Sequence, residues 1–359
     1  MKCLSLMRVI FLVVISRWGV NLKVLPVGKV PIDVLERIVF PRVGVRSGRV
    51  VLGPAVGEDA AVIDAGDKFL VVASDPITGA SRDAGWYAVH VNANDVAVRG
   101  ARPLFLTLTV LLPRGTDEGL LDEVMRGADS AARELGVSIV GGHTEVTPFL
   151  DHPVVCGTMI GEVEREKLVT TSGARPGDLI IATKHAGLEG ASILAWERYD
   201  ELIDVVGREA LDRAKEFSRE LSVVREALAL NEKCRVTAMH DPTEGGIIGG
   251  LIELSIASKT GFQIEERSIP VSEETRKICE ALSVNPLRLI SSGMLLAVIE
   301  RGDVEVAAEV LDGLGVKWSV IGEVTKSDRV IVGRRGTTEA GDEIFEELWE
   351  ALRKPVARR

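Results

Sequence analysis

Four stretches of the chain place a carboxylate at the end of an apolar run or near the start of a helix. They are Gly57-Glu58-Asp59, Asp75, Asp95 and Glu145. Each acid alone would also suit a helix cap or a solvated turn, because Asp and Glu in loops are usually exposed. If they converge, carboxylates about 4 Å apart repel by roughly 4 kcal/mol per pair at an effective dielectric constant of 20. Cations must then lie among them, and Mg²⁺, which bridges carboxylates to phosphate oxygens, is the expected ion.

A second candidate site leads directly into an apolar helix. Its sequence is His240-Asp241-Pro242-Thr243-Glu244-Gly245-Gly246. Thr243 is placed to cap the helix, while Gly245 and Gly246 leave backbone N–H groups open to an anion at the positive end of the helix dipole. A close-packed helix start that needs no ligand fits the same residues. His143 and His240 each flank an acid and are candidates for orienting a substrate or transferring a proton, although single histidines are also common as structural residues.

Length and composition exclude several classes of protein. A chain of 359 residues suggests two domains, and 46% hydrophobic against 27% charged residues excludes a disordered chain. The formal net charge of −10 would repel a phosphate backbone, so we expect no nucleic-acid partner. The sequence contains no Walker, Rossmann, zinc-protease or esterase motif. The carboxylates are therefore the main indication of function in the sequence.

The cysteines and the first residues bear on location. The four cysteines are scattered and form no C-x-x-C pair, which predicts reduced thiols and a cytoplasmic protein. An apolar run at residues 9–15 is too short to span a membrane, so we expect residues 1–24 to be an extension outside the fold. A weak membrane association or a signal peptide is the alternative. A single Gln and five Asn fit a heat-adapted source.

Hydrophobic patterning predicts an α+β protein built from two units. The first should contain a helix begun by Pro31, strands at 60–63 and 69–73, a helix at 85–98, a strand at 104–112, a helix opened by Thr116 and stopped by Gly136, and strands at 137–140 and 154–160. This order favours a sheet with helices on one face. The turn at 174–178 is the predicted boundary, after which a strand at 179–183, helices to about 230 and at 246–258, a strand at 294–299, a helix at 304–314 and strands near 320 and 330 should follow. We expect domains at 25–168 and 169–336, with a C-terminal helix and tail at 337–359.

The order of motifs resembles the superfamily of aminoimidazole ribonucleotide synthetase. This superfamily also includes the hydrogenase-maturation protein HypE, selenophosphate synthetase and thiamine-monophosphate kinase. The matching strings are Gly57-Glu58-Asp59-Ala60-Ala61-Val62, Ser74-Asp75, Asn94-Asp95, Gly100-Ala101-Arg102-Pro103, Gly141-Gly142-His143-Thr144-Glu145, Arg175-Pro176-Gly177-Asp178, Asp241-Pro242-Thr243-Glu244-Gly245-Gly246 and Ile321-Gly322-Glu323. They span most of the chain in the family's order, so the set is more specific than any one string.

The resemblance implies a two-domain α+β architecture whose N-terminal domain binds ATP and dimerises through its sheet. It implies Mg·ATP in the cleft, with metal ligands at Glu58, Asp59, Asp75 and Asp95. Cofactor-binding positions would be Gly57, Asn94, Gly142, Thr243, Gly245 and Gly246, and catalytic ones His143, Glu145 and Asp241. Members of the superfamily transfer a phosphoryl group from ATP to a substrate oxygen, which is chemistry of positioning and charge neutralisation.

Within the superfamily the chain looks most similar to HypE, with two departures. HypE carries its carbamoyl group on a C-terminal cysteine, whereas the last cysteine here is Cys279. The usual Gly-Asp-Thr is Gly142-His143-Thr144, so Glu145 or His143 is the candidate replacement for the missing acid. We therefore expect a HypE-like, Mg·ATP-dependent enzyme that activates a carbamoyl, amide or carboxyl oxygen, with hydrogenase or metallocentre maturation as the expected process and a maturation protein as the expected partner. A small-molecule kinase and a non-catalytic ATP-binding assembly partner are the alternatives.

Overall fold

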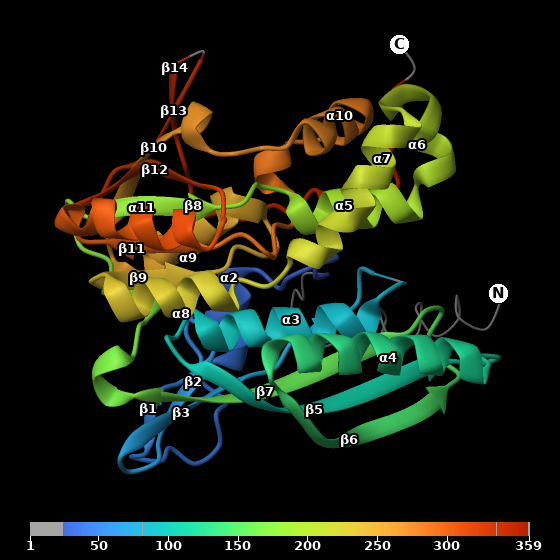
Figure 1. Cartoon of the computed structure of the whole chain (residues 1–359), viewed down its shortest axis with the longest axis horizontal. Coiled ribbons are helices and arrows are strands. Elements are labelled where there is room, and N and C mark those ends of the chain that lie inside the picture. The colour runs from blue at the N-terminus through green and yellow to red at the C-terminus, as the bar shows by residue number, and fades with distance from the viewer. Residues whose placement is uncertain (1–23, 81, 335, 358–359) are drawn as a thin grey trace, which may run out of the picture.

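In the computed structural model the described residues, 24–80, 82–334 and 336–357, form two seven-stranded sheets with helices packed between and around them (Figure 1). The first sheet has the order β1-β2-β3-β7-β5-β6, with β4 paired to β7. Its strands are β1 Val50–Leu52, β2 Ala61–Asp64, β3 Lys68–Ala73, β4 Pro76–Ile77, β5 Arg102–Pro113, β6 Ser138–Thr147 and β7 Val154–Glu164. All pairs are antiparallel except β5 with β6.

Helices α3 (Ala84–Ala97) and α4 (Glu118–Leu135) cover one face of this sheet (Figure 1). All 14 residues of α3 are buried, because the helix lies between the sheet and the second unit. Two glycines of β7 allow its close approach: a Cβ on Gly157 would lie 2.5 Å from Asn92 Nδ2, and one on Gly161 would lie 2.4 Å from Val96 Cγ1. The sheet therefore fixes the position of α3, which carries Asp95.

The second sheet has the order β14-β13-β10-β12-β8-β11-β9. Its strands are β8 Leu179–Thr183, β9 Val236–His240, β10 Gly261–Glu265, β11 Leu296–Ile299, β12 Trp318–Thr325, β13 Arg329–Gly333 and β14 Gly336–Glu339. The α-helices of this half are α5 Leu188–Glu197, α6 Tyr199–Val206, α7 Arg208–Lys215, α8 Val224–Lys233, α9 Gly246–Ser258, α10 Glu273–Leu282 and α11 Val304–Gly313. Short 3₁₀ turns are η2 Arg165–Lys167, η3 Thr171–Gly173, η4 Glu216–Glu220, η5 Glu266–Ser268, η6 Pro286–Arg288 and η7 Arg301–Asp303.

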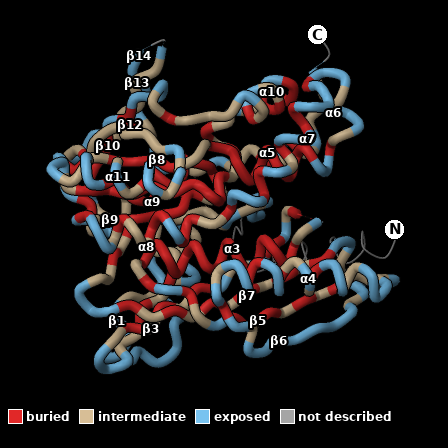
Figure 2. Tube along the Cα trace, in the orientation of Figure 1, coloured by how far each residue is buried: buried red, intermediate tan, exposed pale blue. Residues whose placement is uncertain are grey.

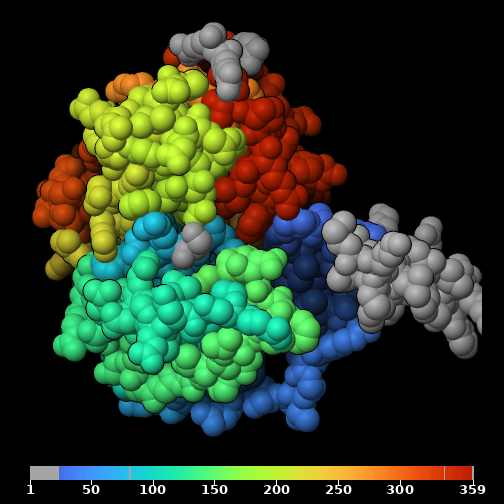
Figure 3. Space-filling model, turned by 90° about the vertical axis from the view of Figure 1, so that its right-hand side faces the viewer, coloured from blue at the N-terminus to red at the C-terminus, as the bar shows by residue number. Residues whose placement is uncertain are grey.

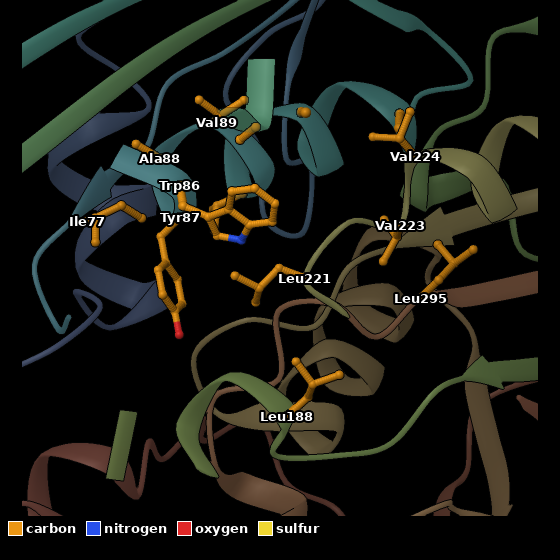
Figure 4. Packing of buried hydrophobic residues seen from close by; sticks show 14 of the residues in the cluster. Ile77, Trp86, Tyr87, Ala88, Val89, Leu188, Leu221, Val223, Val224 and Leu295 are labelled. Atoms are coloured by element: carbon orange, nitrogen blue, oxygen red, sulfur yellow. The ribbon is translucent and has the colours of Figure 1, made fainter. Parts of the chain in front are cut away.

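The two halves share one continuous apolar core. Figure 4 shows Trp86 and Tyr87 of α3 facing Leu188 and Leu221 of the second half. The indole Nε1–H of Trp86 also donates to the Ser218 carbonyl across the junction, at 2.8 Å. Figure 2 shows buried residues both along α3 and on elements of the second half. Because interiors are close-packed, side chains from the two halves are held in a fixed relation to one another.

Segments near the two ends of the described chain meet beside this junction. The N-terminal segment contains α2 (Ile32–Val34) and a π-helical turn, η1 (Leu35–Val39), and the C-terminal segment contains α12 (Leu348–Ala351). Figure 3 shows the first, in blue, against the second, in red. Gly28 lies against this C-terminal segment, since a Cβ on it would lie 3.0 Å from the Trp349 indole nitrogen. None of the helices in the described ranges is long and apolar enough to cross a membrane.

The predicted α+β fold, with helices on one face of the first sheet, is confirmed. The helix predicted to open at Thr116 begins two residues later, because the Asp117 side chain accepts the Leu120 N–H at 3.1 Å and acts as the N-cap. The predicted strand at 137–140 was too short, since β6 continues to Thr147 and therefore contains Glu145. Residues 1–23, including the predicted extension and Cys3, lie outside the described residues. The domain boundaries stay predictions.

Candidate functional site

Four aspartates from both halves of the fold converge at the junction. Asp59 precedes β2, Asp75 follows β3, Asp95 lies on α3 and Asp241 follows β9. Burial, followed by the charges of Asp75, Asp241 and Asp59, raises the pKa of Asp95 well above its ordinary value. Burial and the charge of Asp59 also raise the pKa of Asp75. The fold therefore concentrates negative charge here, as the sequence predicted for three of these four acids.

Asp241 has two buried, unpartnered oxygens in this group, which we call the aspartate cluster (Asp59, Asp75, Asp95 and Asp241). Both of its carboxylate oxygens are buried and have no hydrogen-bond partner among the residues that the structure describes. Burial and the charge of Asp59 raise its pKa well above the ordinary value. One ligand atom each from Asp59, His240 and Asp241 lies within 4.8 Å of the others. Buried carboxylates without partners are costly, and a divalent cation would relieve that cost.

Arg99 places a buried positive charge next to the cluster. Its guanidinium is fully buried and bonds Glu58 Oε2 at 2.6 Å and Asp59 Oδ2 at 2.7 Å. It also donates to Thr171 Oγ1 at 2.6 Å and to the Met239 carbonyl at 3.2 Å, both of which belong to the second half. Arg99 therefore joins the loop that carries Asp59 to the second half of the fold.

Glu58, a predicted metal ligand, lies beside the cluster with both oxygens engaged. Besides Arg99, its carboxylate accepts the backbone N–H groups of Thr171 and Ser172, each at 3.2 Å. A metal role for Glu58 would require these bonds to be exchanged. In this structure Glu58 acts as a bridge between the two halves.

His240 connects Asp59 to a buried glutamate of α9. Its Nδ1 lies 2.9 Å from Asp59 Oδ2, and its Nε2 lies 3.1 Å from Glu253 Oε2. Glu253 Oε1 in turn accepts from Lys29 Nζ at 2.6 Å. Burial alone would lower the pKa of His240, but the two carboxylates outweigh it and raise that pKa to about 10. Because both ring nitrogens face carboxylates, His240 has no nitrogen left for a metal and is placed to orient Asp59.

Two asparagines of α3 have different partners. Asn92 accepts the Asp75 N–H at 2.8 Å and donates to the Asp75 carbonyl at 3.1 Å, so it fixes the backbone of a cluster member. Asn94, a predicted nucleotide-binding residue, donates to the Leu221 carbonyl and accepts the Val223 N–H, each at 2.8 Å. Both functional groups of its amide are thus used between α3 and the second half.

The start of α9 differs from the prediction. Thr243 was predicted to cap the helix, but the N-cap is Gly245 and no side chain caps it. The Gly245 N–H donates to the Glu346 carboxylate of the C-terminal segment at 2.6 Å, and the Ile290 N–H donates to the same carboxylate at 3.2 Å. Gly245 has a φ of 82°, and a Cβ on it would lie 2.3 Å from Ile344 Cγ2. The chain's own carboxylate therefore takes the place where an anion was predicted.

The Glu346 contact predicts a pH dependence of folding stability. Burial raises the pKa of Glu346 to about 7, although the backbone N–H groups of Gly245, Leu348 and Ile290 favour the ionised form. Because this folded-state pKa exceeds that of the unfolded chain, the folded state binds the extra proton, and stability should fall as pH rises from about 4.5 to about 7. Urea unfolding of the wild type and Glu346→Gln across this range measures it. As pH rises, the free energy of unfolding of the wild type should fall relative to that of Glu346→Gln. A difference between the two that does not change with pH would contradict this prediction.

Gly142, His143 and Glu145 lie away from the cluster within one chain. They belong to β6, the edge strand of the first sheet, and β7 and β5 separate it from β3. His143 Nε2 lies 3.1 Å from Glu145 Oε2, and these side chains are 62% and 51% exposed. Gly142 allows close pairing, since a Cβ there would lie 1.8 Å from the Leu108 carbonyl oxygen. These residues could therefore fill their predicted roles only if a ligand or a second protein chain binds at the exposed surface of β6.

A cavity of about 1010 Å³ opens beside α9, and none of the four aspartates of the cluster is among its lining residues. Its walls are the N-terminal segment, α9, the turn before β13 and residues 342–346. Lys29 and Glu253 belong both to this wall and to the ion-pair chain that reaches Asp59. Pockets that hold small ligands commonly reach this volume. The cavity is therefore large enough for a nucleotide-sized molecule.

Comparison with known families agrees with this geometry. Residues 57–163 match the family model described as AIR synthase related protein, N-terminal domain, and residues 175–334 match that of the C-terminal domain. The chain belongs to the AIR synthase related protein family. The resemblance derived from the motifs is thereby confirmed. Gly57, which begins the first match, is required by packing: its φ is 74°, and a Cβ there would lie 2.7 Å from the Glu253 carbonyl oxygen.

Relatives of this AIR synthase related chain include hydrogenase-maturation proteins. A putative hydrogenase expression/formation protein of Methanocaldococcus jannaschii is 30% identical over 322 residues, which are 86% of this chain and 93% of the relative. The carbamoyl dehydratase HypE of Cupriavidus necator is 30% identical over 302 residues, 82% of each chain. A thiamine-monophosphate kinase of Pyrococcus horikoshii is 27% identical over 295 residues, 79% of this chain and 88% of the kinase.

Solved structures give the same family relationship. The hydrogenase maturation protein HypE in complex with ATP has a TM-score of 0.67 at 27% identity, covering 83% of this chain and 92% of that one. A chain of a HypE–HypF complex has a TM-score of 0.68 at 25% identity, covering 86% of this chain and 99% of that one. The predicted similarity to HypE is confirmed.

Sequence reasoning missed Lys29, Asn92, Arg99 and Glu253. Two of them had a readable signal. Glu253 is the only charged residue of α9, which is otherwise apolar or small. Arg99 directly follows the apolar run Val96-Ala97-Val98. A charge inside an apolar run requires a buried partner, so both residues pointed to partners among the acids.

Proposed function

We propose that this chain is a Mg·ATP-dependent enzyme that transfers a phosphoryl group to a carbamoyl, amide or carboxyl oxygen, in hydrogenase or metallocentre maturation. The observation that carries the proposal is the aspartate cluster with its unpartnered, buried Asp241 oxygens. Hard carboxylate oxygens of this kind are the ligands that Mg²⁺ uses when it binds substrate phosphates. The HypE relative solved with ATP and the carbamoyl dehydratase relatives support the nucleotide and the substrate class.

In this proposal Asp59, Asp75, Asp95 and Asp241 hold the metal. Arg99 and His240 both bond Asp59 Oδ2, and no described residue bonds Oδ1, which leaves that oxygen for the ion. Asp241, predicted to be catalytic, fits better as a ligand because nothing else uses its oxygens. Bound Mg²⁺ would neutralise the charge of the triphosphate and of the transferring group. Asn92 holds Asp75, and the cavity lined by Lys29 and Glu253 would take the body of the nucleotide.

The exposed surface of β6 supports the proposal of a homodimer. Val140 and Val146 on this strand are 58% exposed, and Phe105 on the neighbouring β5 is 43% exposed. Exposed apolar side chains gathered on one sheet edge mark an interaction site. Self-association there would place His143 and Glu145 at an interface. The HypE–HypF complex supports a maturation partner as a further binding protein, and the free thiols of the described cysteines fit a cytoplasmic location.

A small-molecule kinase is the second candidate, because a thiamine-monophosphate kinase covers 79% of this chain at 27% identity. One experiment separates the two: the purified protein is incubated with Mg·ATP and a panel of carbamoyl, amide and phosphate-ester compounds, and nucleotide and product masses are read together. We expect ADP and free phosphate with a dehydrated or ligated product. A stable phosphorylated product would establish the kinase instead. ATP binding without turnover on any compound would contradict both and leave an assembly partner.

A further inference from the structure

Glu253 is a buried charge in an apolar helix, and each of its oxygens bonds one cationic group. Its side chain is 3% exposed. Oε1 accepts from Lys29 Nζ at 2.6 Å, and Oε2 faces His240 Nε2 at 3.1 Å. The fold therefore fixes the glutamate at both ends, and it cannot rotate without breaking an ion pair.

His240 links the fixed Glu253 side chain to Asp59. The other ring nitrogen, Nδ1, lies 2.9 Å from Asp59 Oδ2, so the ring stands between two carboxylates and is within hydrogen-bonding distance of both. Asp59 Oδ2 also accepts a hydrogen bond from Arg99, which lies just after α3 in the first half. Two donors from different halves of the fold thus hold one oxygen of Asp59 and set the direction of the other.

Backbone packing brings the same two elements together independently of these side chains. Gly57 stands two residues before Asp59, and its missing Cβ allows the loop to lie directly on the Glu253 carbonyl, 2.7 Å from where that Cβ would be. The loop that carries Asp59 is therefore seated on the turn of α9 that carries Glu253. A shift of α9 would move both the backbone and the hydrogen-bonded side chain of Asp59.

We propose that Glu253 is a positioning residue for the metal ligand Asp59 and acts through His240. Glu253 holds the imidazole so that Nδ1–H points at Asp59 Oδ2, and this leaves Oδ1 directed at the ion. This inference rests on the proposed function, because it takes Asp59 to be a metal ligand. Outer partners that orient ligands in this way typically contribute 10–100-fold to metal affinity.

The test measures Mn²⁺ binding to the full chain without nucleotide, by electron paramagnetic resonance or calorimetry. Glu253→Gln should weaken Mn²⁺ binding by about 10–100-fold. Glu253→Asp keeps the charge but withdraws the carboxylate from His240, so it should also weaken Mn²⁺ binding. This variant tests the proposal if Glu253→Gln does not fold. The matched control is Glu244→Gln, which removes a negative charge from the same cavity wall without a contact to His240. We expect the control to lose roughly threefold or less, because only a long-range charge term is removed.

A double-mutant cycle with His240→Gln decides whether Glu253 acts through the histidine. Once His240 is replaced, its ring no longer links Glu253 to Asp59. We therefore expect Glu253→Gln to weaken Mn²⁺ binding little further in that background. Equal losses for Glu253→Gln and Glu244→Gln, full affinity in Glu253→Asp, or additive losses with His240→Gln would each overturn the inference while leaving the proposed function standing. A wild type that binds no Mn²⁺ would instead overturn the proposed function and this inference with it.

Discussion

Replacing Asp241 by asparagine should make the metal-free protein more stable and at the same time remove Mg²⁺ binding. The Asp241 carboxylate is buried, unpartnered and repelled by Asp59, and these effects raise its pKa well above normal. A neutral side chain of the same size relieves that repulsion, and we expect a gain of about 1–3 kcal/mol in the free energy of unfolding. Losing a ligand that has no other partner should weaken Mg·ATP binding by at least a hundredfold, or about 3 kcal/mol.

Thermal unfolding and calorimetric titration of the same variant measure the two effects. Asp67→Asn is the matched control, because it makes the same chemical change in the exposed turn between β2 and β3, outside the aspartate cluster. The control should change neither quantity noticeably. If Asp241→Asn instead destabilises the metal-free protein and keeps its affinity for Mg·ATP, Asp241 has a structural role and the cluster is not a metal site.

Replacing Arg99 by methionine should be among the most destabilising single changes in the chain. The guanidinium is fully buried and holds Glu58 and Asp59, and it reaches the second half through Thr171 and the Met239 carbonyl. Removing one partner of a buried ion pair leaves the other charge unpaired, which costs about 3–5 kcal/mol. Chemical denaturation should show this loss as a lower midpoint of the transition.

The double variant Arg99→Met with Glu58→Gln gives the internal check for that prediction. Neutralising Glu58 removes one of the two charges stranded by the loss of Arg99, so the double variant should recover part of the lost stability. Arg126→Met is the surface control, since Arg126 makes an exposed pair with Asp122 on α4, and such pairs contribute about 0–1 kcal/mol. A loss no larger than that of the control would show that the two halves do not depend on Arg99.

Local patterning predicted most elements because their signals are carried by neighbouring residues. The amphipathic helix α4, stopped by Gly136 with a φ of 69°, and the alternating strand β5 are cases where periodicity and burial agree. The parallel pairing of β5 with β6 and the continuation of β6 to Thr147 depend on contacts between distant segments. Thr243 failed as a cap because the N-terminal turn of α9 is formed by Gly245 against Ile344, a residue about a hundred positions later.

Three of the four converging aspartates could be chosen from the sequence, whereas the residues that hold them in place could not. Asp59, Asp75 and Asp95 could be chosen because each acid precedes, follows or interrupts an apolar run. The pairing of Glu58 with Arg99 and the docking of Glu346 on Gly245 are long-range contacts that no local pattern encodes. Glu145 was grouped with the acids by its place in the sequence and His143 because it flanks an acid, whereas the sheet order places both on a separate edge strand.

The convergence of the aspartate cluster on one divalent ion is the central claim, and anomalous X-ray diffraction from crystals soaked with Mn²⁺ and a non-hydrolysable ATP analogue tests it most directly. We expect a metal peak in contact with carboxylate oxygens of Asp59, Asp75, Asp95 and Asp241, with phosphate oxygens completing the coordination. A nucleotide bound elsewhere, or metal peaks confined to surface carboxylates while the Asp241 oxygens stay without a ligand, would contradict it.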